Sequence, residues 1–457
     1  MLKYETDSRK IQKGQVFVAI PGHTVDGHDY IENAILNGAS EVIAEKDVKA
    51  SVPVHKVANT SIFLKEELKK LYADRINELK IIGVTGTNGK TTTCYLTYQL
   101  LKKLGVKVAY MGTIGFYFEE EVKPLQNTTP DILTIYKLFT EVLEKGCTTI
   151  VMEVSSHSID LERIYGLKFS LGAFTNLTED HLDYHKTMEN YLACKLKILN
   201  YLKKEGIFIV NSDDKSSKEF QKAFKNTLEI GMNAKDYQIL SYQFHALGTD
   251  VKIKYQNQEY LFKNRLFSKF NVYNFVTAIA LVQNLGYSLE ELQRISQEIL
   301  PPKGRCEACR VKEGQAIVDY AHTPDAVEKV IDSFKELAKA RIITVIGCGG
   351  DRDPYKRPIM GKMATEKSDY VILTNDNPRT EDPRRIMDDI ISGIQKKNYE
   401  VIFDRKQAIN KALDMIEKDD IVLILGKGHE NYQIIGKERI HFDDVEQIIN
   451  YQKEHEF

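Results

Sequence analysis

The residues best suited to chemistry stand in one short loop, Gly86-Thr87-Asn88-Gly89-Lys90-Thr91-Thr92, between an apolar run and a helical pattern. A strict phosphate loop has the form G-x-x-x-x-G-K-[ST], and here Val84 occupies the position of the first glycine. The remaining glycines still let backbone N–H groups turn toward phosphate oxygens, and the following helix directs its positive end at an anion. Lys90 adds a positive charge, and the Thr91 hydroxyl can reach Mg²⁺. We therefore predict an ATP-binding loop rather than a simple glycine turn.

Two polar side chains follow apolar runs that are typical of buried strands. Glu153 ends the run TTIVMEV, and His181 comes shortly after SLGAFTN. Because ligands gather at the carboxyl ends of strands in α/β sheets, both residues can face the loop and help to hold the Mg²⁺ of ATP. Taken alone, His181 would be interpreted as a hydrogen-bonded surface histidine, but the flanking TNLTEDHLDYH favours a role at the loop.

Lys195 lies within YLACKLKILNYL, whose spacing indicates a helix. The pattern predicts that Leu192, Leu196 and Leu199 are buried and that Lys195 lies at the edge of the core. The residue type alone indicates a lysine that packs its stem on apolar surface and keeps its charge in water.

The pattern of the sequence divides the 457 residues into three segments. A chain of this length is long enough for three domains of ~150 residues each. Residues 1–79 alternate short strands and helices. Residues 80–302 begin with the strand LKIIGV and the loop, alternate strands with helices, pass through a β-rich stretch and close on two helices, the second opened by a capping box at Ser288. Residues 303–457 alternate again, and Pro324 fits the first position of a helix. This pattern predicts an α/β protein with a parallel central sheet and a second, doubly wound sheet.

Composition excludes several classes of protein. A net charge of −2 gives no basic field for nucleic acid or an anionic membrane, and 42% hydrophobic with 28% charged residues is typical of a globular protein. The N-terminus lacks the apolar core of a signal peptide, and no run of ~18 apolar residues could span a bilayer. Cys306 and Cys309 form a C-x-x-C pair without the second pair that a zinc ribbon needs, so we expect reduced thiols and a cytoplasmic location.

GTNGKTT is also the nucleotide-loop signature of the Mur ligases and of their folylpolyglutamate and cyanophycin synthetase relatives. The resemblance extends over essentially the whole chain through motifs at 153–157 (EVSSH), 175–185 (TNLTEDHLDYH), 191–195 (YLACK), 271–274 (NVYN), 304–307 (GRCE), 319–325 (DYAHTPD), 347–353 (GCGGDRD), 376–379 (DNPR) and 426–430 (GKGHE). Their order is similar to that of the family member that adds the third residue to the peptidoglycan precursor. The resemblance implies three domains: a small UDP-substrate-binding domain, a P-loop ATPase domain and a Rossmann-like C-terminal domain.

The resemblance implies an ATP-dependent, ADP-forming ligase of cell-wall synthesis, with consequences for cell shape and division. ATP would phosphorylate a carboxylate of UDP-N-acetylmuramoyl-L-alanyl-D-glutamate, and the amine of a diamino acid would then displace phosphate. Since phosphoryl transfer is mostly positioning and charge neutralisation, Lys90, Thr91, Glu153, His181 and Lys195 would hold ATP and two magnesium ions. Lys195 would first take up CO₂, because the resulting carbamate is an anion that helps to hold the second ion. We expect a monomer whose partners are these small molecules.

Two further sets of residues resemble family positions. Those around the nucleotide are Asn274, Arg305 and Asp319, for which a helix cap, a linker charge and a strand-end turn are the alternatives. Those around the UDP-sugar-peptide are Thr6, Ser8, His23, Thr24, Val25, Asn127, Thr128, Thr129, Ser155 and Arg163. Leu161 departs from the family pattern, because many relatives have glutamine there and leucine cannot form the hydrogen bond.

The third segment would select the amino acid. The motif Asp376-Asn377-Pro378-Arg379 is associated with meso-diaminopimelate, whose distal carboxylate a guanidinium can bind in a bidentate manner. Arg352 would assist with the carboxyl groups, and Gly426 and Glu430 would meet the distal amine. The alternative for Arg379 is an ion pair with Glu381 or Asp382. L-Lysine lacks the distal carboxylate, whereas meso-lanthionine carries the same terminal groups and is not excluded by the motif.

Other functions are consistent with parts of the pattern. A folylpolyglutamate or cyanophycin-type ligase is disfavoured by the N-terminal segments TDSRK and GHTVDGH and by DNPR. A P-loop switch or motor ATPase would leave DNPR and GKGHE without a role, and a catalytically dead binding protein would not need Lys90, Glu153, His181 and Lys195. Because the phosphate loop and the amino-acid motifs lie on different segments, we also expect a domain movement.

Overall fold

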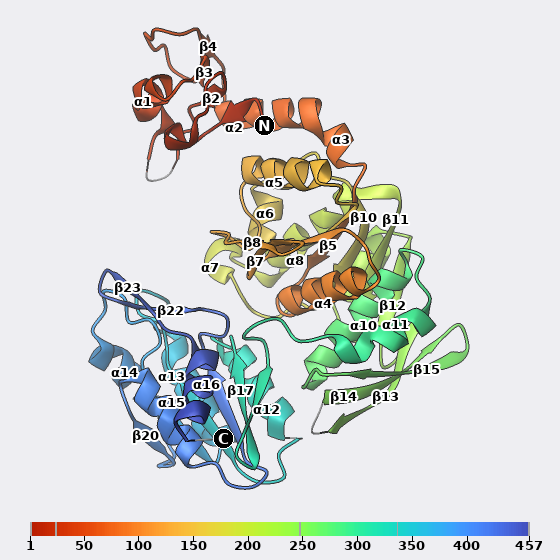
Figure 1. The fold of residues 1–457 in the computed structure, drawn as a ribbon, viewed down its shortest axis with the longest axis vertical. Coiled ribbons are helices and arrows are strands. Elements are labelled where there is room, and N and C mark those ends of the chain that lie inside the picture. The colour runs from red at the N-terminus through yellow and green to blue at the C-terminus, as the bar shows by residue number, and fades with distance from the viewer. Residues whose placement is uncertain (1, 23–24, 246–247, 336, 456–457) are drawn as a thin grey trace. The chain divides into compact units, whose positions relative to one another are not determined.

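The computed structural model describes residues 2–22, 25–245, 248–335 and 337–455. The chain forms two compact units, Met1–Lys235 with Thr277–Tyr287 and Asp236–Val276 with Ser288–Phe457. Each unit combines helices with sheets that contain parallel strands (Figure 1). The predicted α/β class is confirmed, while the domain boundaries after residues 79 and 302 stay predictions.

The first unit begins with a small sheet of four parallel strands in the order β1-β2-β3-β4. Its strands are β1 (Tyr4–Glu5), β2 (Val16–Val18), β3 (Glu41–Ala44) and β4 (Val54–Lys56). Its helical segments are η1 (Ser8–Lys10), η2 (Gly27–Tyr30), α1 (Ile31–Leu36), α2 (Thr60–Leu68), the π-helix η3 (Lys69–Ala73) and α3 (Asp74–Ile76). An ion pair between Lys137 and the buried Glu5 ties this sheet to the rest of the unit.

A second sheet of this unit carries the phosphate loop. Within the unit its order is β12-β11-β10-β5-β9-β6-β7-β8, parallel from β12 to β6 and antiparallel beyond. The strands are β5 (Lys80–Thr85), β6 (Val108–Gly112), β7 (Gly115–Phe118), β8 (Glu121–Lys123), β9 (Thr149–Glu153), β10 (Phe169–Phe174), β11 (Leu202–Asn211) and β12 (Thr227–Gly231). Because β9 and β10 flank β5 in parallel, the carboxyl ends of all three meet at one edge of the sheet.

The helices of this part follow the strands in alternation. They are α4 (Lys90–Lys103), α5 (Ile132–Glu144), α6 (Ser156–Asp160), α7 (Leu182–His185), α8 (Met188–Leu196), η4 (Lys197–Tyr201) and α9 (Ser217–Ala223). Helix α5 begins at Asp131, whose carboxylate accepts a hydrogen bond from Thr134 N at 3.0 Å. Its apolar face, which includes Ile135 and Phe139, is buried in the core of the unit. Burial of each such side chain stabilises the fold by roughly 1.5–3 kcal/mol.

The second unit opens with three antiparallel strands, β13 (Tyr237–His245), β14 (Gly248–Tyr255) and β15 (Gln258–Asn264). The helices α10 (Lys269–Gln283) and α11 (Leu289–Ile295) and the short η5 (Ser296–Glu298) follow, and α10 runs across the division between the units. The predicted capping box is confirmed: Glu291 N donates to Ser288 Oγ at 3.2 Å, and Ser288 N donates to Glu291 Oε2 at 2.9 Å.

A six-stranded sheet, in the order β16-β17-β21-β18-β19-β20, forms the rest of this unit. All neighbours are parallel except the edge strand β16, which confirms the predicted doubly wound sheet. The strands are β16 (Glu307–Val311), β17 (Gly314–Asp319), β18 (Ile342–Ile346), β19 (Tyr370–Leu373), β20 (Tyr399–Val401) and β21 (Ile421–Leu425), with a separate hairpin of β22 (Tyr432–Ile435) and β23 (Glu438–His441).

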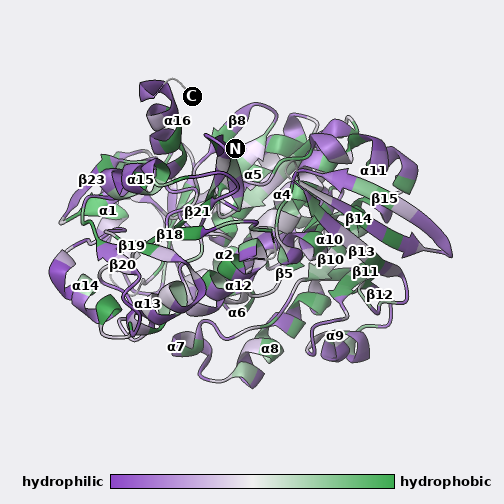
Figure 2. Ribbon diagram, turned by 90° about the horizontal axis from the view of Figure 1, so that it is seen from below, coloured by the Kyte–Doolittle hydropathy of each residue, from purple (hydrophilic) through white to green (hydrophobic). Residues whose placement is uncertain are grey.

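Helices cover both faces of the six-stranded sheet. They are α12 (Pro324–Lys335), α13 (Lys356–Lys367), α14 (Pro383–Ile391), α15 (Arg405–Asp414) and α16 (Asp444–Glu454), and α12 begins at Pro324 as predicted. Two buried apolar clusters lie on opposite faces, one with α12, α13 and α14 and the other with α15 and α16. Figure 2 shows hydrophobic and hydrophilic residues alternating along α14 and α16, as expected for helices with one face in the core. Among the described residues, no helix is both long and apolar enough to cross a membrane.

Candidate functional site

The phosphate loop joins β5 to α4 and takes a conformation that requires its glycines. Gly86 has φ +145° and Gly89, the N-cap of α4, has φ +85°. A Cβ added at Gly86 would lie 2.0 Å from Thr175 Oγ1. Lys90 folds back over the loop, since its ammonium donates to the carbonyl oxygens of Gly86 at 3.0 Å and Thr87 at 2.7 Å. The loop therefore places its backbone and its ammonium around one point, as phosphate binding requires.

The segment after β10 supports the loop from the neighbouring strand. Thr87 N donates to the Asn176 carbonyl oxygen at 2.8 Å, and Asn88 N donates to Asn176 Oδ1 at 3.0 Å. Thr175 Oγ1 donates in return to the Asn88 carbonyl oxygen at 2.6 Å. The motif 175–185, singled out in the sequence, thus fixes the conformation of the loop.

Glu153, at the end of β9, joins the phosphate loop to the end of β6. Its Oε2 accepts from Thr91 Oγ1 at 3.0 Å and from Thr113 Oγ1 at 3.3 Å. Its Oε1 accepts from Tyr110 OH at 2.7 Å and from Thr113 N at 2.8 Å. Gly112 is required beside it, because an added Cβ would lie 2.1 Å from Glu153 Oε1. Glu153 is completely buried, so these four donors compensate for the loss of water around its carboxylate.

Residues predicted for the sugar-peptide gather around the same glutamate. Thr129 Oγ1 donates to the Glu153 carbonyl oxygen at 2.8 Å, and Thr128 Oγ1 lies 3.0 Å from Thr113 Oγ1. Arg163 Nη1 donates to the Thr129 carbonyl oxygen at 2.8 Å, and Ser155 N donates to Thr129 Oγ1 at 3.2 Å. The structure therefore brings these four predicted residues to the edge of the sheet that carries the phosphate loop, and the exposed Asn127 adjoins them in sequence.

The other residues predicted for the UDP-substrate belong to the N-terminal sheet and its loops. Thr6 N donates to Glu5 Oε1 at 2.9 Å, Ser8 is buried at the start of η1, and Val25 is exposed. His23 and Thr24 lie outside the described residues.

The prediction that Lys195 lies at the edge of the core is wrong. Its side chain is only 1% exposed, whereas Leu192 and Leu196 are only partly buried. The face of α8 that packs inward contains Cys194 and Lys195, because Cys194 Sγ donates to the Ser156 carbonyl oxygen and Lys195 Nζ donates to the Gly86 carbonyl oxygen at 2.8 Å. Lys195 is therefore buried with its ammonium in contact with the phosphate loop.

The surroundings of Lys195 disfavour an ammonium ion. Its Nζ lies 4.3 Å from the centre of the Tyr191 ring, and no salt bridge reaches it among the described residues. Burial, together with the nearby Lys90 cation, holds the pKa of Lys195 well below its usual range. A neutral amine is consequently easier to form here than on an exposed lysine.

His181 lies beside this group at the N-terminus of α7, in a left-handed conformation with φ +55°. Its side chain is 46% exposed, and its ring contacts the His157 ring edge-on at 4.9 Å between centroids. Burial lowers the pKa of His181, and the nearby Lys90 cation adds to the effect while Asp180 opposes it. Neutral imidazole is the form that can bind a metal ion.

The residues Asn274, Arg305 and Asp319, predicted around the nucleotide, lie in the second unit. Arg305 stacks on the Tyr320 ring with its guanidinium carbon 4.7 Å from the centroid. Asp319, at the end of β17, accepts from Cys306 N and Ala321 N, both at 2.8 Å. Burial raises the pKa of Asp319, and Arg305 opposes that shift. Asn274 is buried in α10, where its Nδ2 donates to Asn271 Oδ1 at 3.0 Å.

The motifs predicted for the amino acid come together at the carboxyl ends of β19 and β21. Asn377 Nδ2 donates to Glu430 Oε2 at 2.8 Å, which joins DNPR to GKGHE. Gly426 has φ +112°, and a Cβ there would lie 2.8 Å from Asp376 Oδ2. Arg379 Nη1 donates to the Gly350 carbonyl oxygen at 2.7 Å. DNPR, GKGHE and the glycine-rich loop after β18 thus form one cluster, with Pro378 buried between Asn377 and Arg379.

The ion pairs considered for Arg379 do not form. The Glu381 carboxylate is bound by the buried Arg357 through two contacts of 2.7 Å, and Asp382 caps α14. Arg352 is exposed and donates to the Asp351 carbonyl oxygen at 3.3 Å. The side chains of Arg352 and Arg379 both lie near Gly349.

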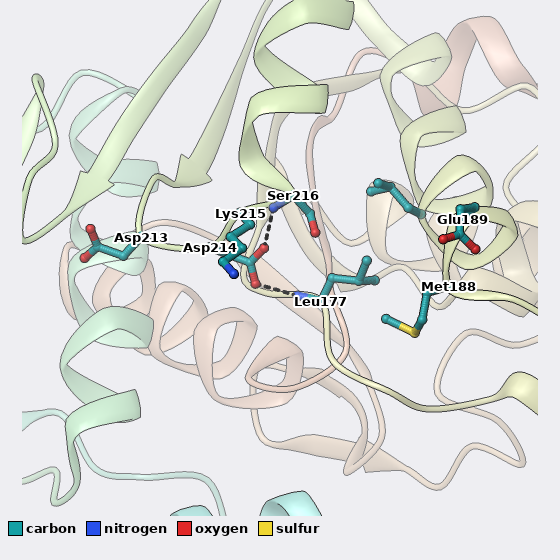
Figure 3. A pocket seen from close by; sticks show the side chains of 8 residues that line it. Leu177, Met188, Glu189, Asp213, Asp214, Lys215 and Ser216 are labelled. Atoms are coloured by element: carbon teal, nitrogen blue, oxygen red, sulfur yellow. Dashed lines mark hydrogen bonds between the residues drawn. The ribbon is translucent and has the colours of Figure 1, made fainter.

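A pocket of about 500 Å³ lies beside Leu177, in the segment after β10. Figure 3 shows Asp214 between Leu177 and Ser216, whose backbone N–H groups each donate to its carboxylate at 2.8 Å. The pocket is lined by Leu177, Met188, Glu189, Leu192, Asp213, Asp214, Lys215 and Ser216. None of these residues was predicted for a site, and Asp214 holds the segment that supports the phosphate loop through its contact with Leu177 N.

Three residues of the candidate site were missed in the sequence. Tyr110 and Thr113, which bind Glu153, lie at the end of β6, and Lys427 lies at the centre of the amino-acid cluster. Tyr110 and Thr113 could have been found from the polar residues that end an apolar strand, in the sequence YMGT. The signal for Lys427 was its place inside GKGHE.

Three family models match the chain: "Mur ligase family, catalytic domain" over residues 4–82, "Mur ligase middle domain" over 84–282 and "Mur ligase, glutamate ligase domain" over 304–428. Similar proteins include UDP-N-acetylmuramoyl-L-alanyl-D-glutamate--2,6-diaminopimelate ligases from Bacillus cereus, 41% identical over 453 residues, and Parabacteroides distasonis, 42% identical over 458 residues. The two alignments cover 97% of this chain, with 92% and 93% of the respective relatives.

Solved structures of similar proteins extend the likeness to the fold. A structure of UDP-N-acetylmuramoyl-L-alanyl-D-glutamate--2,6-diaminopimelate ligase has a TM-score of 0.71 and 32% identity, covering 99% of this chain and 95% of the other. MurF ligase from Thermotoga maritima in complex with ADP has a TM-score of 0.70 and covers 99% of this chain and 98% of the other. At 21% identity, the second likeness concerns the fold alone.

Proposed function

The chain belongs to the Mur ligase family, and from that premise we propose that it joins meso-diaminopimelate to UDP-N-acetylmuramoyl-L-alanyl-D-glutamate at the expense of ATP. The product would be a peptidoglycan precursor. The names of the similar ligases support the acceptor and the amino acid, and their coverage of nearly the whole chain supports the complete reaction. We further propose a monomer in the cytoplasm, with UDP-substrate, ATP and amino-acid domains divided near residues 79 and 302.

The position of Glu153 is the observation that carries this proposal. Its carboxylate accepts from Thr91 of the phosphate loop, and its carbonyl oxygen accepts from Thr129 of the segment proposed to bind the acceptor. The γ-phosphate of ATP and a carboxylate of the acceptor would therefore be held at the same edge of the sheet. This arrangement favours transfer of phosphate to a carboxylate rather than to water, because both reactants are positioned before reaction.

The donor set around the loop fits magnesium. Glu153 and Thr91 offer oxygen atoms 3.0 Å apart, and His181 offers an imidazole whose pKa is lowered. The described residues contain no cluster of three or more histidine, cysteine or acidic side chains that could enclose a metal ion. Such a sparse set suits Mg²⁺, which keeps several waters and binds substrate phosphates. We propose that Thr91, Glu153, His181 and carbamylated Lys195 hold two ions, which would neutralise charge on the phosphates.

A carbamate on Lys195 would remove the repulsion between the buried Lys195 ammonium and the nearby, partly buried Lys90 ammonium. CO₂ reacts with a neutral amine, and the burial of Lys195 beside Lys90 favours that form. The product carries a negative charge in place of a positive one, so its interaction with Lys90 changes from repulsion to attraction. We infer that Lys195 acts in the carbamylated form.

The amino acid would bind in the cluster of the second unit. Arg379 and Arg352 offer guanidinium groups for carboxylates, and Glu430 offers a carboxylate for the distal amine. A free amine would then attack the acyl phosphate of the acceptor, and inorganic phosphate would leave. Arg305, Asp319 and Asn274 would contact the nucleotide when the domains close.

The test is phosphate release from ATP and Mg²⁺ with the UDP-muramoyl dipeptide and one amino acid in each tube. We expect release with meso-diaminopimelate, little with L-lysine and none without an amino acid. Equal release with lanthionine would widen the specificity, and a preference for lysine would overturn the role of Arg379.

The control for this test compares two lysines of α4. Lys90→Ala should abolish release, whereas Lys103→Ala, which changes an exposed lysine at the far end of the helix, should not. Absence of amino-acid-dependent release in every tube would overturn the ligase function.

A further inference from the structure

Lys427, the lysine of GKGHE, is buried at the centre of the amino-acid cluster, although the proposed function assigns it no role. It follows β21, and its side chain is 0% exposed. Its ammonium donates to Asn377 Oδ1 at 3.3 Å, to Glu430 Oε2 at 3.2 Å and to the Tyr432 carbonyl oxygen. An ammonium has three N–H donors, so Lys427 has all of them engaged by the protein and none left for a substrate.

Because of the same contacts, the two carboxylate oxygens of Glu430 differ in the hydrogen bonds that they accept. Oε2 accepts from Lys427 and from Asn377 Nδ2, the latter at 2.8 Å. Among the residues that the structure describes, the only contact of Oε1 is a long one of 3.4 Å from the Tyr432 hydroxyl. Since each carboxylate oxygen can accept about two hydrogen bonds, Oε1 retains acceptor capacity while Oε2 is occupied. The carboxylate is therefore held in one orientation, with one oxygen ready for a donor.

We propose that Lys427 is a positioning residue that holds Glu430 so that Oε1 receives an amine of the incoming diamino acid. The inference rests on the proposed function and adds to it the residue that orients the amine-binding carboxylate. Lys427 also balances the charge of Glu430. Recognition of the amine consequently depends on the direction of Oε1 rather than on a general negative charge, which any cation would satisfy.

A separate ion pair anchors the end of β21, so Lys427 is not needed for that purpose. Arg405 and Asp444 are both fully buried and form two hydrogen bonds of 2.7 and 2.8 Å. Arg405 Nη2 also donates to the Leu425 carbonyl oxygen at 3.0 Å, immediately before Gly426. The contacts of Lys427, by contrast, all go to the DNPR and GKGHE motifs and to the strand that follows GKGHE.

The experiment compares meso-diaminopimelate with 2-aminopimelate, which has the same chain and carboxylates but lacks one amine. The wild type should prefer diaminopimelate in kcat/KM. Lys427→Met and Glu430→Gln should each reduce that preference by about tenfold or more, since a charged hydrogen bond to the amine is lost or misdirected. The double variant should be no worse than Glu430→Gln, because both changes act on one interaction. KM for ATP and for the acceptor should stay within about twofold of wild type.

Lys312→Met is the matched control, because it removes a lysine of the same unit that donates to the carbonyl oxygens of Leu413 and Asp414. It should leave the preference unchanged. If Lys427→Met does not fold, Lys427→Arg retains the charge but not the three contacts and should show the same loss of preference.

An unchanged preference in the Lys427 variants would overturn the role of Lys427, whether kcat/KM stays at the wild-type value or falls equally with both amino acids. A wild type without preference would overturn the assignment of Glu430 Oε1. Failure of the proposed function is a different outcome, because the wild type would then release no phosphate with either amino acid.

Discussion

The two units each bury a lysine within a proposed site, but they surround it in opposite ways. Lys195 is 1% exposed and Lys427 is 0% exposed. Lys195 meets a carbonyl oxygen, an aromatic ring and the nearby Lys90 cation. Lys427 meets the Glu430 carboxylate, the Asn377 amide and a carbonyl oxygen.

The groups that surround a buried amine, more than its burial, therefore decide whether the amine can react or instead holds other groups in place. A buried cation without a carboxylate favours its neutral form, and a neutral amine can react. A buried cation paired with a carboxylate is suited to hold other groups in place. We therefore propose that Lys195 takes part in chemistry and that Lys427 takes part in positioning.

Replacement of Lys195 should have the largest effect. It tests directly whether Lys195 takes part in the chemistry. We expect Lys195→Ala to reduce ligase activity by about 10²–10³-fold, because the anion proposed for magnesium is lost. A short carboxylic acid in the buffer should restore part of the activity, since it can supply an anion in the vacated space. Lys427→Met should show no such rescue. Unchanged activity in Lys195→Ala, measured by phosphate release, would remove the distinction between the two lysines.

Arg379→Lys should have the next largest effect. It tests whether the second unit recognises the amino acid through a guanidinium–carboxylate contact. Lysine keeps the charge but cannot form the planar, two-point contact with a carboxylate. We expect KM for meso-diaminopimelate to rise by about 10–100-fold, with KM for ATP unchanged. Arg384→Lys, an exposed change on α14, is the control. Steady-state kinetics that show equal KM values for the two variants would argue that Arg379 has no role in carboxylate binding.

A smaller effect is expected at the ion pair between Arg357 and Glu381. This pair tests whether a buried cation with a carboxylate partner contributes to the stability of the fold. Arg357 lowers the pKa of Glu381 to about 2. The carboxylate therefore stabilises the fold fully above its unfolded pKa of ~4.3, and this stabilisation is lost as the pH falls toward 2. We expect Glu381→Gln to lower the free energy of unfolding by roughly 1.5–3 kcal/mol at pH 7 and by less at pH 3. Urea titrations at both pH values measure this, and a pH-independent difference would contradict the assignment.

Leu161→Gln should have the smallest effect. Leu161 ends α6 with its side chain 50% exposed, two residues before Arg163. A polar residue there should change the free energy of unfolding by less than about 0.5 kcal/mol, and KM for the acceptor by about twofold at most. A tenfold lower KM would mean that the lost polar contact matters, and the group around Glu153 would then extend to this position.

Local features of the fold could be predicted because neighbouring residues determine them. The strand–loop–helix around Gly86 and Gly89, the capping box at Ser288 and the helix start at Pro324 all depend on a few adjacent side chains and on backbone freedom. The ordered motifs also indicated candidate site residues, whose roles stay predictions. The pairing of Glu153 with Tyr110 and Thr113 could not be predicted, because it depends on which strand lies beside β9.

The strand–loop–helix around the phosphate loop, the alternation of strands with helices and the ligase motifs can all be recognised in the sequence. How each charged group is surrounded depends on the tertiary structure. Lys195 meets a carbonyl oxygen 109 residues earlier, and Lys427 meets an amide 50 residues earlier. Helical spacing reports which residues share a face over a few turns, but it does not report what that face packs against. The charge environment of an amine depends on those distant groups, so folding, rather than residue type, sets the two lysines apart.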